Sequence, residues 1–267
     1  MDFWKRNLAL FKLAVMTNLE YRFNFFTDAL VQPLLGVVIE LLLWKAIFAT
    51  SGVATIAGFE ESSYLAYSLW GPFFARIAVS WMYETRMIEE VASGSINSLI
   101  VRPISFYEYY LSQLMGYKVI TTVVGLLIPV VASLYFKLPM QLERLPLALL
   151  LCFYYLLLVH TISFIISCCA FFFNRIHSFT VAKNILIFLF TGELVPIDMM
   201  PALMKEVMLM LPFSSGVFIP VAYIIGRADL GMVLNGFISV SVGLILFNLF
   251  AYWIWRKGLA NYVGTGA

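Results

Sequence analysis

Residues 146–173 read PLALLLCFYYLLLVHTISFIISCCAFFF, a run with no Asp, Glu, Lys or Arg. The hydrocarbon core of a bilayer is about 30 Å thick, and an α-helix crosses it with about 20 residues at a rise of 1.5 Å each. The run is long enough to cross even if the helix is tilted. It is therefore predicted to be a membrane-spanning helix.

Five other apolar runs accompany it, and they set the predicted architecture. The six predicted spans are residues 23–50, 63–83, 111–136, 146–173, 184–197 and 231–255. The fifth has only about 14 residues and is followed by a proline-rich stretch up to residue 220. Broken chain at membrane depth is tolerated only where protein or water satisfies its backbone. We therefore expect an all-α polytopic protein with six transmembrane helices, and a re-entrant external helical hairpin within 196–229 before the last span.

The composition excludes an ordinary soluble protein. Hydrophobic residues make up 62% of the 267 residues, or about 63% when glycine is counted in place of tyrosine, and charged residues make up 12%. The corresponding shares in soluble domains are roughly 45–50% and 25%. The net charge is +2, without the concentrated basic face of a nucleic-acid binder. Cys152, Cys168 and Cys169 lie inside one apolar run, so we expect small core residues and no disulfides between loops.

Loop charges predict the orientation. Segments 1–22, 83–110, 174–183 and 256–267 hold 10 Lys or Arg, whereas the opposite loops, 51–62, 137–145 and 198–229, hold 4. The positive-inside rule places the first set, and with it both termini, in the cytoplasm. The bias is moderate, because the inner segments are also longer. The first 22 residues lack the short apolar core of a cleavable signal peptide, so we expect the N-terminus to be retained.

Residues 1–22 form a first predicted unit, and residues 23–267 form the transmembrane domain. Apolar side chains recur at helical steps in the first unit, with lysine and arginine off the stripe; they are Trp4, Leu8, Phe11, Val15 and Leu19. This pattern is typical of a helix that lies on the inner leaflet. A plain anchor and a gating element that moves with a partner are both compatible with it.

The connection 83–110 is predicted to be a structured elbow. A helix through Glu84, Glu89 and Glu90 is stopped at Ser93-Gly94, and a second apolar stretch runs to Arg102-Pro103. The residue before a proline is pushed out of helical geometry, which fixes the exit of the elbow. Such a compact unit can carry motion from one part of a complex to another.

Charged residues within spans are the best sequence indication of a transport path. In the first span Asp28, Gln32, Gly36 and Glu40 lie on one stripe at steps of four. Arg76 lies at a depth that permits contact with Asp28, and Lys118 lies at a similar depth. Structural packing and the lining of a path both remain open for these groups and for Glu193. Because Glu40 and Glu193 are far apart in sequence and have no histidine beside them, we infer no proton relay.

No catalytic or metal motif accompanies these charges. His160 stands alone in an apolar run and His177 in a predicted short loop, so the paired ligand spacing of a zinc site is missing. There is no nucleophile elbow of the G-x-S-x-G type and no G-x-x-x-x-G-K-[ST] phosphate cradle. We expect a chain that is not an enzyme, binds no cofactor or metal, and does not itself hydrolyse ATP.

Three stretches together resemble the six-span permease subunits of bacterial type-2 ATP-binding-cassette exporters. The elbow carries a G-x-[IL]…L…RP pattern at Gly94-Ser95-Ile96, Leu99 and Arg102-Pro103. The other two matching stretches are Gly192-Glu193-Leu194-Val195-Pro196 with Pro201, Leu211-Pro212-Phe213 and Pro220, and the tail with Trp255, Gly258, Leu259, Tyr262 and Gly266-Ala267. Each is weak alone, but they cover the chain in order.

The resemblance implies a permease of the bacterial inner membrane that pairs with a second permease, identical or related, and with two separate cytoplasmic ATPase subunits that bind ATP and Mg²⁺. The elbow and the N-terminal helix would transmit the closure of the ATPases to the spans. The residues expected to couple are Glu84, Glu89, Glu90, Gly94, Arg102 and Pro103. The first, second and fifth spans would line the path, and the candidate path residues are Asp28, Gln32, Glu40, Arg76 and Glu193.

There are two alternatives to an exporter of a hydrophobic or amphipathic molecule. A secondary transporter predicts matching broken spans in two halves, and only 184–220 is broken here. A membrane-embedded transferase needs a His or Asp dyad near one interface. Exporter permease is the favoured hypothesis.

Overall fold

The computed structural model of this chain describes residues 3–20, 27–52, 55–56, 58–173, 175–193 and 195–262. Their regular structure is helical apart from one antiparallel ladder between β1 (Thr55–Ile56) and β2 (Phe59–Glu60). The predicted all-α class is therefore confirmed.

The helices follow one another through short connections. In chain order they are α1 (Phe3–Glu20), η1 (Thr27–Val31), α3 (Gln32–Ser51), α4 (Glu61–Ala78), α5 (Trp81–Ser93), α6 (Asn97–Ile100), α7 (Phe106–Gly125), α8 (Leu127–Tyr135), η2 (Leu142–Arg144), α9 (Leu145–Cys168), η3 (Cys169–Phe171), α10 (His177–Phe190), η4 (Ile197–Met199), α11 (Ala202–Met210), η5 (Pro212–Ser215), α12 (Phe218–Ile224) and α13 (Leu230–Asn261).

Four stretches of the described chain are helical and apolar over a length that crosses a bilayer. They are Pro33–Ser51, Phe106–Tyr135, Leu142–Phe171 and Leu230–Asn261. They coincide with the first, third, fourth and sixth predicted spans, so a polytopic membrane protein is confirmed. At the other two positions, α4 contains Glu61, Pro72 and Arg76, and α10 has only 14 residues. The count of six spans remains a prediction.

Two predicted boundaries are wrong. α4 ends at Ala78, Val79 is extended (φ −104°, ψ 151°), and α5 begins at Trp81, so the second predicted span is divided before residue 83. α10 begins at His177, which was expected in a loop, and ends at Phe190. The reason is Lys183, which was counted as a loop charge but is buried within α10 beside a partner carboxylate.

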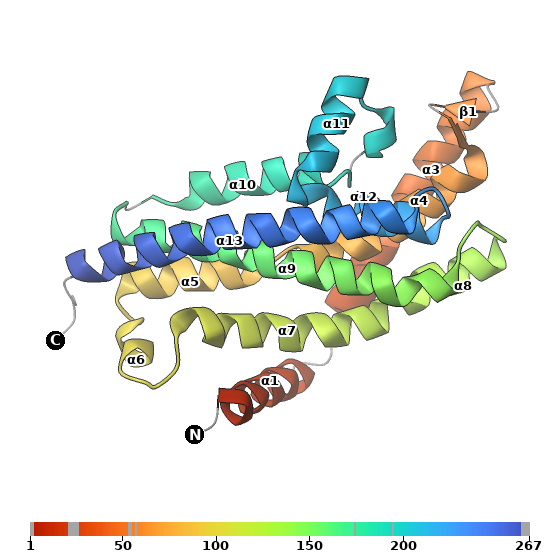
Figure 1. The fold of residues 1–267 in the computed structure, drawn as a ribbon. Helices are drawn as coiled ribbons and strands as arrows, with labels where there is room; N and C mark the ends of the chain where they lie inside the picture. Colours follow the sequence, from red (N-terminus) through yellow and green to blue (C-terminus); the bar gives the residue numbers. More distant parts are fainter. Residues whose placement is uncertain are drawn as a thin grey trace.

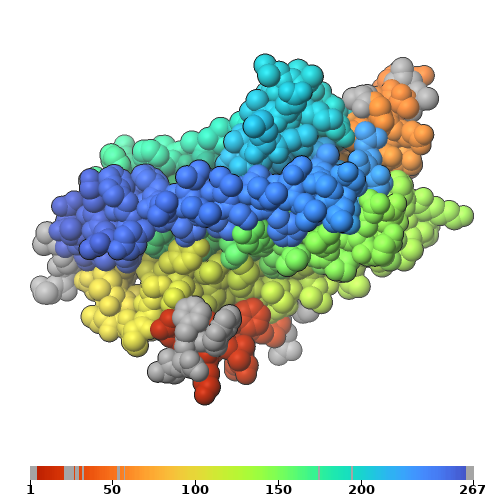
Figure 2. Space-filling model, in the orientation of Figure 1, coloured from red at the N-terminus to blue at the C-terminus, as the bar shows by residue number. Residues whose placement is uncertain are grey.

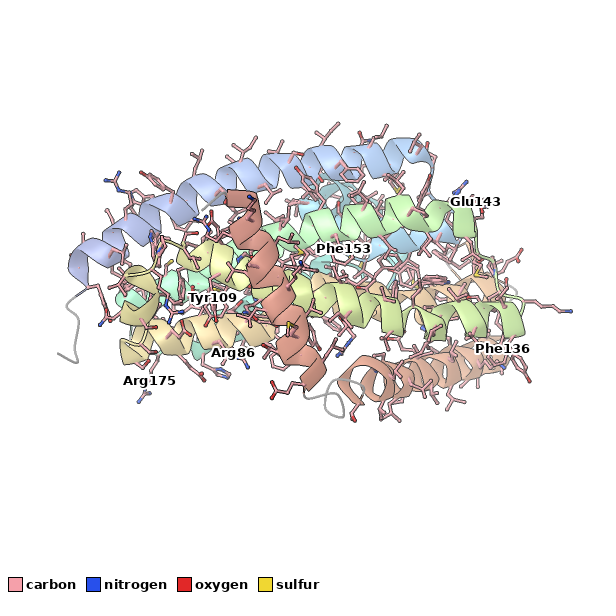
Figure 3. All side chains as sticks on the ribbon, turned by 90° about the horizontal axis from the view of Figure 1, so that it is seen from below. Arg86, Tyr109, Phe136, Glu143, Phe153 and Arg175 are labelled. Carbon is pink, nitrogen blue, oxygen red and sulfur yellow. The ribbon has the colours of Figure 1, made fainter. Side chains whose placement is uncertain are left out.

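α9 lies at the centre of the helix bundle. α13 runs alongside it, and α4, α5 and α12 pack against it from other sides (Figure 1). α3 packs against α4, and α1 lies across α7, as Figure 3 shows from below. We call the end of the bundle that holds α6 and the last turns of α13 the elbow end. The end with β1, β2 and the last turn of α8 is the hairpin end.

The region 196–229 is helical and broken, as predicted. α11 projects from the side of the bundle and forms a knob on the space-filling surface (Figures 1 and 2), whereas α12 is almost wholly buried. Its re-entry into the membrane remains a prediction.

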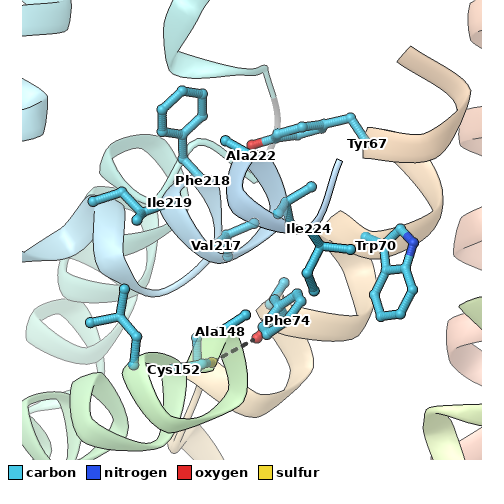
Figure 4. Packing of buried hydrophobic residues seen from close by; sticks show 14 of the residues in the cluster. Tyr67, Trp70, Phe74, Ala148, Cys152, Val217, Phe218, Ile219, Ala222 and Ile224 are labelled. Atoms are coloured by element: carbon cyan, nitrogen blue, oxygen red, sulfur yellow. Dashed lines mark hydrogen bonds between the residues drawn. The ribbon is translucent and has the colours of Figure 1, made fainter. Parts of the chain in front are cut away.

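Aromatic side chains dominate the core between α4, α9 and α12. Tyr67 of α4 packs against Phe218 of α12, and Phe74 points toward the same core (Figure 4), whereas Trp70 donates to the hydroxyl of Ser133 on α8. Cys152 of α9 lies between them, with its Sγ 3.7 Å from the carbonyl oxygen of Phe74 (Figure 4) and 3.3 Å from that of Gly216. Cys152 and Cys168 are buried and all three cysteines are free thiols, as expected of core residues.

The outward faces of α3 and α13 are apolar and exposed. Examples are Leu35, Ile39 and Leu42 on α3, and Ile245 and Leu249 on α13. A soluble protein rarely exposes such continuous apolar surface. These faces suit contact with lipid chains.

Candidate coupling elbow and translocation path

The elbow turns at Gly94. Its φ of 80° and ψ of −2° lie in the left-handed region, where a residue with a Cβ is strained, and its N–H faces the carbonyl of Val91 at 3.4 Å. The N–H of Ile96 then bonds to the carbonyl of Glu90 at 3.0 Å, and α6 follows. The expected helix stop at Ser93-Gly94 and the resumption before Arg102-Pro103 are therefore confirmed.

The turn of the elbow at Gly94 is fixed to the chain just after the last helix. The hydroxyl of Tyr262 donates a hydrogen bond of 3.2 Å to the carbonyl of Gly94. Ile96 and Leu99 are buried in an aromatic cluster at the elbow end that includes Phe106, Phe164 and Trp255. The turn is thus held by α13 and α9 as well as by its own hydrogen bonds.

The exit of the elbow at Pro103 is fixed to α1. Arg6 donates one hydrogen bond of 2.9 Å to the carbonyl of Pro103 and forms an ion pair of 2.7 Å with Glu108. The hydroxyl of Ser105 caps α7 by accepting from the N–H of Glu108 at 3.1 Å. Ser105 and Glu108 have the S-x-x-E spacing of a capping box, which can be recognised in the sequence. The ion pair of Glu108 with Arg6 cannot be recognised there.

α1 buries a face that is rotated from the predicted stripe. Leu10 and Ala14 face α7, whereas Leu8 and Leu19 of the stripe are exposed. A Cβ added to Gly116 of α7 would lie 2.6 Å from that of Ala14, so glycine is what permits this close approach. The side chain of Trp4 lies outside the described residues.

Between its two anchors the elbow presents an exposed tip. The tip consists of Asn97, Ser98, Ile100, Val101, Arg102 and Pro103. Val101 is 82% exposed, although it is a β-branched apolar residue. Glu89 is exposed on α5 and Glu90 is half-buried beside the turn. An exposed mixture of apolar and charged groups on a rigid support is suited to contact with another protein.

Glu84 does not belong to this exposed surface, and its role in coupling remains a prediction. It is fully buried and accepts a charge-assisted hydrogen bond from Lys183 of α10. Lys183 also donates to the hydroxyl of Ser163 on α9 at 3.2 Å, and Ser163 lies 2.7 Å from the hydroxyl of Ser80. This network joins α5, α9 and α10 at the point where α4 gives way to α5.

Glu40 and Glu193 are brought together by the fold, although 153 positions separate them in sequence. Both carboxyl groups lie within electrostatic range of the buried Tyr67. The hydroxyl of Tyr67 donates to the carbonyl of Gly192 at 2.7 Å, which fixes the turn that carries Glu193. The sequence separation was therefore a poor guide to their distance, and two of the candidate path residues share one region.

Arg76 and Lys118 meet where α4 crosses α7. Lys118 donates to the carbonyl of Arg76, and the guanidinium of Arg76 donates to the hydroxyl of Tyr117 at 3.2 Å. The side chains of Asp28 and Gln32 lie outside the described residues, so the expected contact between Asp28 and Arg76 remains a prediction.

A partly open cavity of about 350 Å³ runs along α10. Lys183 and Glu193 both line it, together with Ser80, Val159 and Phe188. The lining thus contains a lysine from the middle of α10 and a glutamate from the turn after that helix, together with apolar side chains. Such a cavity can accommodate an amphipathic molecule.

His160 is a core residue, as expected. It is fully buried, its Nε2 lies 3.2 Å from the carbonyl of Tyr107, and its ring packs against that of Tyr107. Within the described residues no group of His, Cys, Asp or Glu is arranged to hold a metal ion.

A family model described as "ABC-2 family transporter protein" matches residues 34–266 of this chain. The match begins within α3 and takes in the elbow and the α10 cavity. A comparison with curated proteins finds no match.

Proposed function

The chain belongs to the ABC-2 transporter family, and from this premise we propose that it is the permease subunit of an ATP-driven exporter. As a multi-pass membrane component of a transporter, it would act in the bacterial cytoplasmic membrane with both termini in the cytoplasm. We infer that the substrate is hydrophobic or amphipathic, such as a lipid, an antibiotic or a glycan-like molecule.

The energy source would be a separate ATP-binding-cassette ATPase. The chain contains no phosphate-binding loop, so ATP and Mg²⁺ would be bound by that partner. A second permease, identical or related, would complete the transporter.

One observation carries the coupling part of the proposal: an exposed elbow tip held on both sides. Tyr262 ties the turn at Gly94 to α13, and Arg6 ties the exit at Pro103 to α1. A force applied at the tip would therefore reach the first and last helices of the chain together. We propose that the ATPase docks on this tip, with Glu89, Glu90 and Arg102 supplying charge and Val101 supplying apolar contact.

The substrate path is proposed to follow the α10 cavity. Glu193 lines it, Glu40 is near enough to interact with Glu193, and the apolar walls suit a hydrophobic substrate. The Glu84–Lys183 network lies between this cavity and the elbow helix. It offers a mechanical link by which movement of α5 shifts α10.

The test is to purify the tagged permease from its own membranes in mild detergent and identify the ATPase that accompanies it. We expect an ATPase whose hydrolysis rate changes when the permease is bound, and ATP-dependent transport in reconstituted vesicles. A permease that carries substrate in vesicles with an ion gradient and no ATPase would overturn the proposal.

A further inference from the structure

We propose that the cleft between α3 and α8 at the hairpin end binds one phospholipid whose headgroup carries both a phosphate and an ammonium group, of the phosphatidylethanolamine type. This inference requires only that the chain lies in a bilayer. It does not depend on the proposed exporter function.

The cleft is large and open, with a volume of about 760 Å³. α3 and α8 diverge as they run toward the hairpin end (Figure 1), and residues at the start of α4 also line the cleft. The inner wall is apolar and is formed by Val38, Leu41, Leu42 and Leu65. An acyl chain fits such a wall, whereas a water-soluble ligand gains nothing from it.

Four charged residues line the same cleft. Lys45 comes from α3, Lys137 follows α8, and Glu60 and Glu61 stand at the start of α4. Within the described part of the chain, none of the four has an ion-pair partner. Charged residues are scarce in this protein, at 12%, so two unpaired charges of each sign around one cleft are unusual.

The spacing of charge and apolar wall matches an amphipathic molecule. Val38 and Lys45 are seven residues apart on α3, which corresponds to about 10 Å along the helix axis. Lys45 lies about two turns from the end of α3 at Ser51, and a lysine there reaches toward the interface by extending its side chain. The headgroup would lie at the charged level and the upper acyl chain along Val38.

Lys137 is held in an uncommon backbone conformation. Its φ is 53°, in the left-handed region where glycine is the usual residue after a helix. The N–H of Leu138 bonds back to the carbonyl of Ser133 at 2.9 Å, which closes the end of α8. A lysine at this strained position directs a charge to the cleft that the favoured glycine would lack.

The signs of the charges select the headgroup. A phosphate binds the lysines, and a primary ammonium binds the glutamates through charge-assisted hydrogen bonds. A headgroup with only negative charge would be opposed by Glu60 and Glu61, and a cationic amphiphile by Lys45 and Lys137. A dipolar phospholipid satisfies all four.

The experiment measures lipid binding to the delipidated full chain by native mass spectrometry and by thermal stabilisation in detergent. We expect phosphatidylethanolamine to bind about tenfold more tightly than phosphatidylglycerol, the difference that a charged hydrogen bond supplies. The Lys45→Gln/Lys137→Gln variant should lose about tenfold for phosphatidylethanolamine. The Glu60→Gln/Glu61→Gln variant should reverse the preference toward phosphatidylglycerol. Glu143→Gln with Lys205→Gln, outside the cleft, is the matched control and should change neither.

A second variant leaves the charges in place. Leu42→Trp fills the apolar wall and should weaken phosphatidylethanolamine binding, while the gel-filtration profile shows that the chain is still folded. The proposal is overturned if phosphatidylglycerol binds the wild-type chain as tightly as phosphatidylethanolamine, or if the double lysine variant binds normally. Equal binding of water-soluble glycerophosphoethanolamine would overturn the lipid as the occupant.

Discussion

Lys183 of α10 donates a hydrogen bond to the carboxylate of Glu84 on α5, and both side chains are almost completely buried. Breaking a buried ion pair by removing one partner leaves an uncompensated charge and costs about 3–5 kcal/mol. We therefore expect Lys183→Met to lower the free energy of unfolding by about that amount.

The matched control for that variant is Lys205→Met, which removes a more exposed ion pair with Asp198 at 2.7 Å. Its expected effect is within about 1 kcal/mol. The double variant Glu84→Gln/Lys183→Met should recover part of the loss, since no charge is left buried. Equal stability of the two single lysine variants in denaturant titrations would show that the buried pair is not a structural link.

Gly94 should be essential for coupling. Gly94→Val forces a β-branched residue into the left-handed region, at a backbone cost of about 1–2 kcal/mol, and displaces the tip. We expect ATPase retention and stimulation to fall more than membrane abundance. Gly52 is the control, since it also caps a helix with positive φ (63°) but lies at the opposite end of the bundle. If Gly52→Val impairs stimulation as much as Gly94→Val, the elbow has no special role.

The ion pair between Arg6 and Glu108 should hold α1 to the elbow. Arg6→Glu places two carboxylates at a distance of a few ångström, so we expect α1 to become sensitive to protease and stimulation of the ATPase to drop. Exchanging both charges, Arg6→Glu/Glu108→Arg, should restore protection in part. Lys12→Glu, on the exposed face of the same helix, is the control. If Arg6→Glu leaves the protection of α1 from protease unchanged, the ion pair with Glu108 does not hold α1 to the elbow.

Glu40 and Glu193 should act on transport together. Each Glu→Gln change keeps the shape of the side chain, so abundance should be normal while the transport rate in vesicles changes several-fold. Because both side chains lie around Tyr67, the double variant should not show the sum of the two effects. Glu143→Gln, exposed in η2, should be silent. Normal transport by both single variants would make these carboxylates tolerated structural residues.

The predicted orientation can be tested by thiol labelling of intact cells. Ser51→Cys should react with an impermeant reagent and Ser95→Cys should react only after the membrane is opened, since both serines are exposed on the protein. Labelling of the unmodified chain gives the background, which should be low because Cys152 and Cys168 are buried. Labelling of Ser95→Cys from outside would reverse the topology.

The elbow could be predicted from sequence because its signals are local. A glycine after a helix and a proline at the exit act on their own neighbours, so Gly94 and Pro103 were assigned without knowledge of the fold. The long apolar helices α9 and α13 were predicted for the same reason, since length and hydropathy are properties of one segment.

Interactions between distant segments could not be predicted in this way. Lys183 looked like a loop charge because its partner Glu84 is 99 residues away. The start of α10 was therefore misplaced, and the burial of Glu84 was not foreseen when it was grouped with Glu89 and Glu90. The proximity of Glu40 and Glu193 was missed for the same reason, since it depends on how α3, α4 and α10 pack.

The contacts of Arg6 with the elbow and α7 also have a consequence for biosynthesis. Its two partners, Pro103 and Glu108, follow it by 97 and 102 residues. At about 5–20 residues per second, translation takes roughly 5–20 s to reach them after Arg6 has been made. During that interval α1 has no α7 to pack on and only the membrane surface can shelter its apolar side chains. The hydrogen bond between Gly94 and Tyr262 forms later still, because Tyr262 follows Gly94 by 168 residues. A nascent chain therefore carries an unfinished elbow until translation has passed α13, and a partner that requires the finished shape can assemble only after that point.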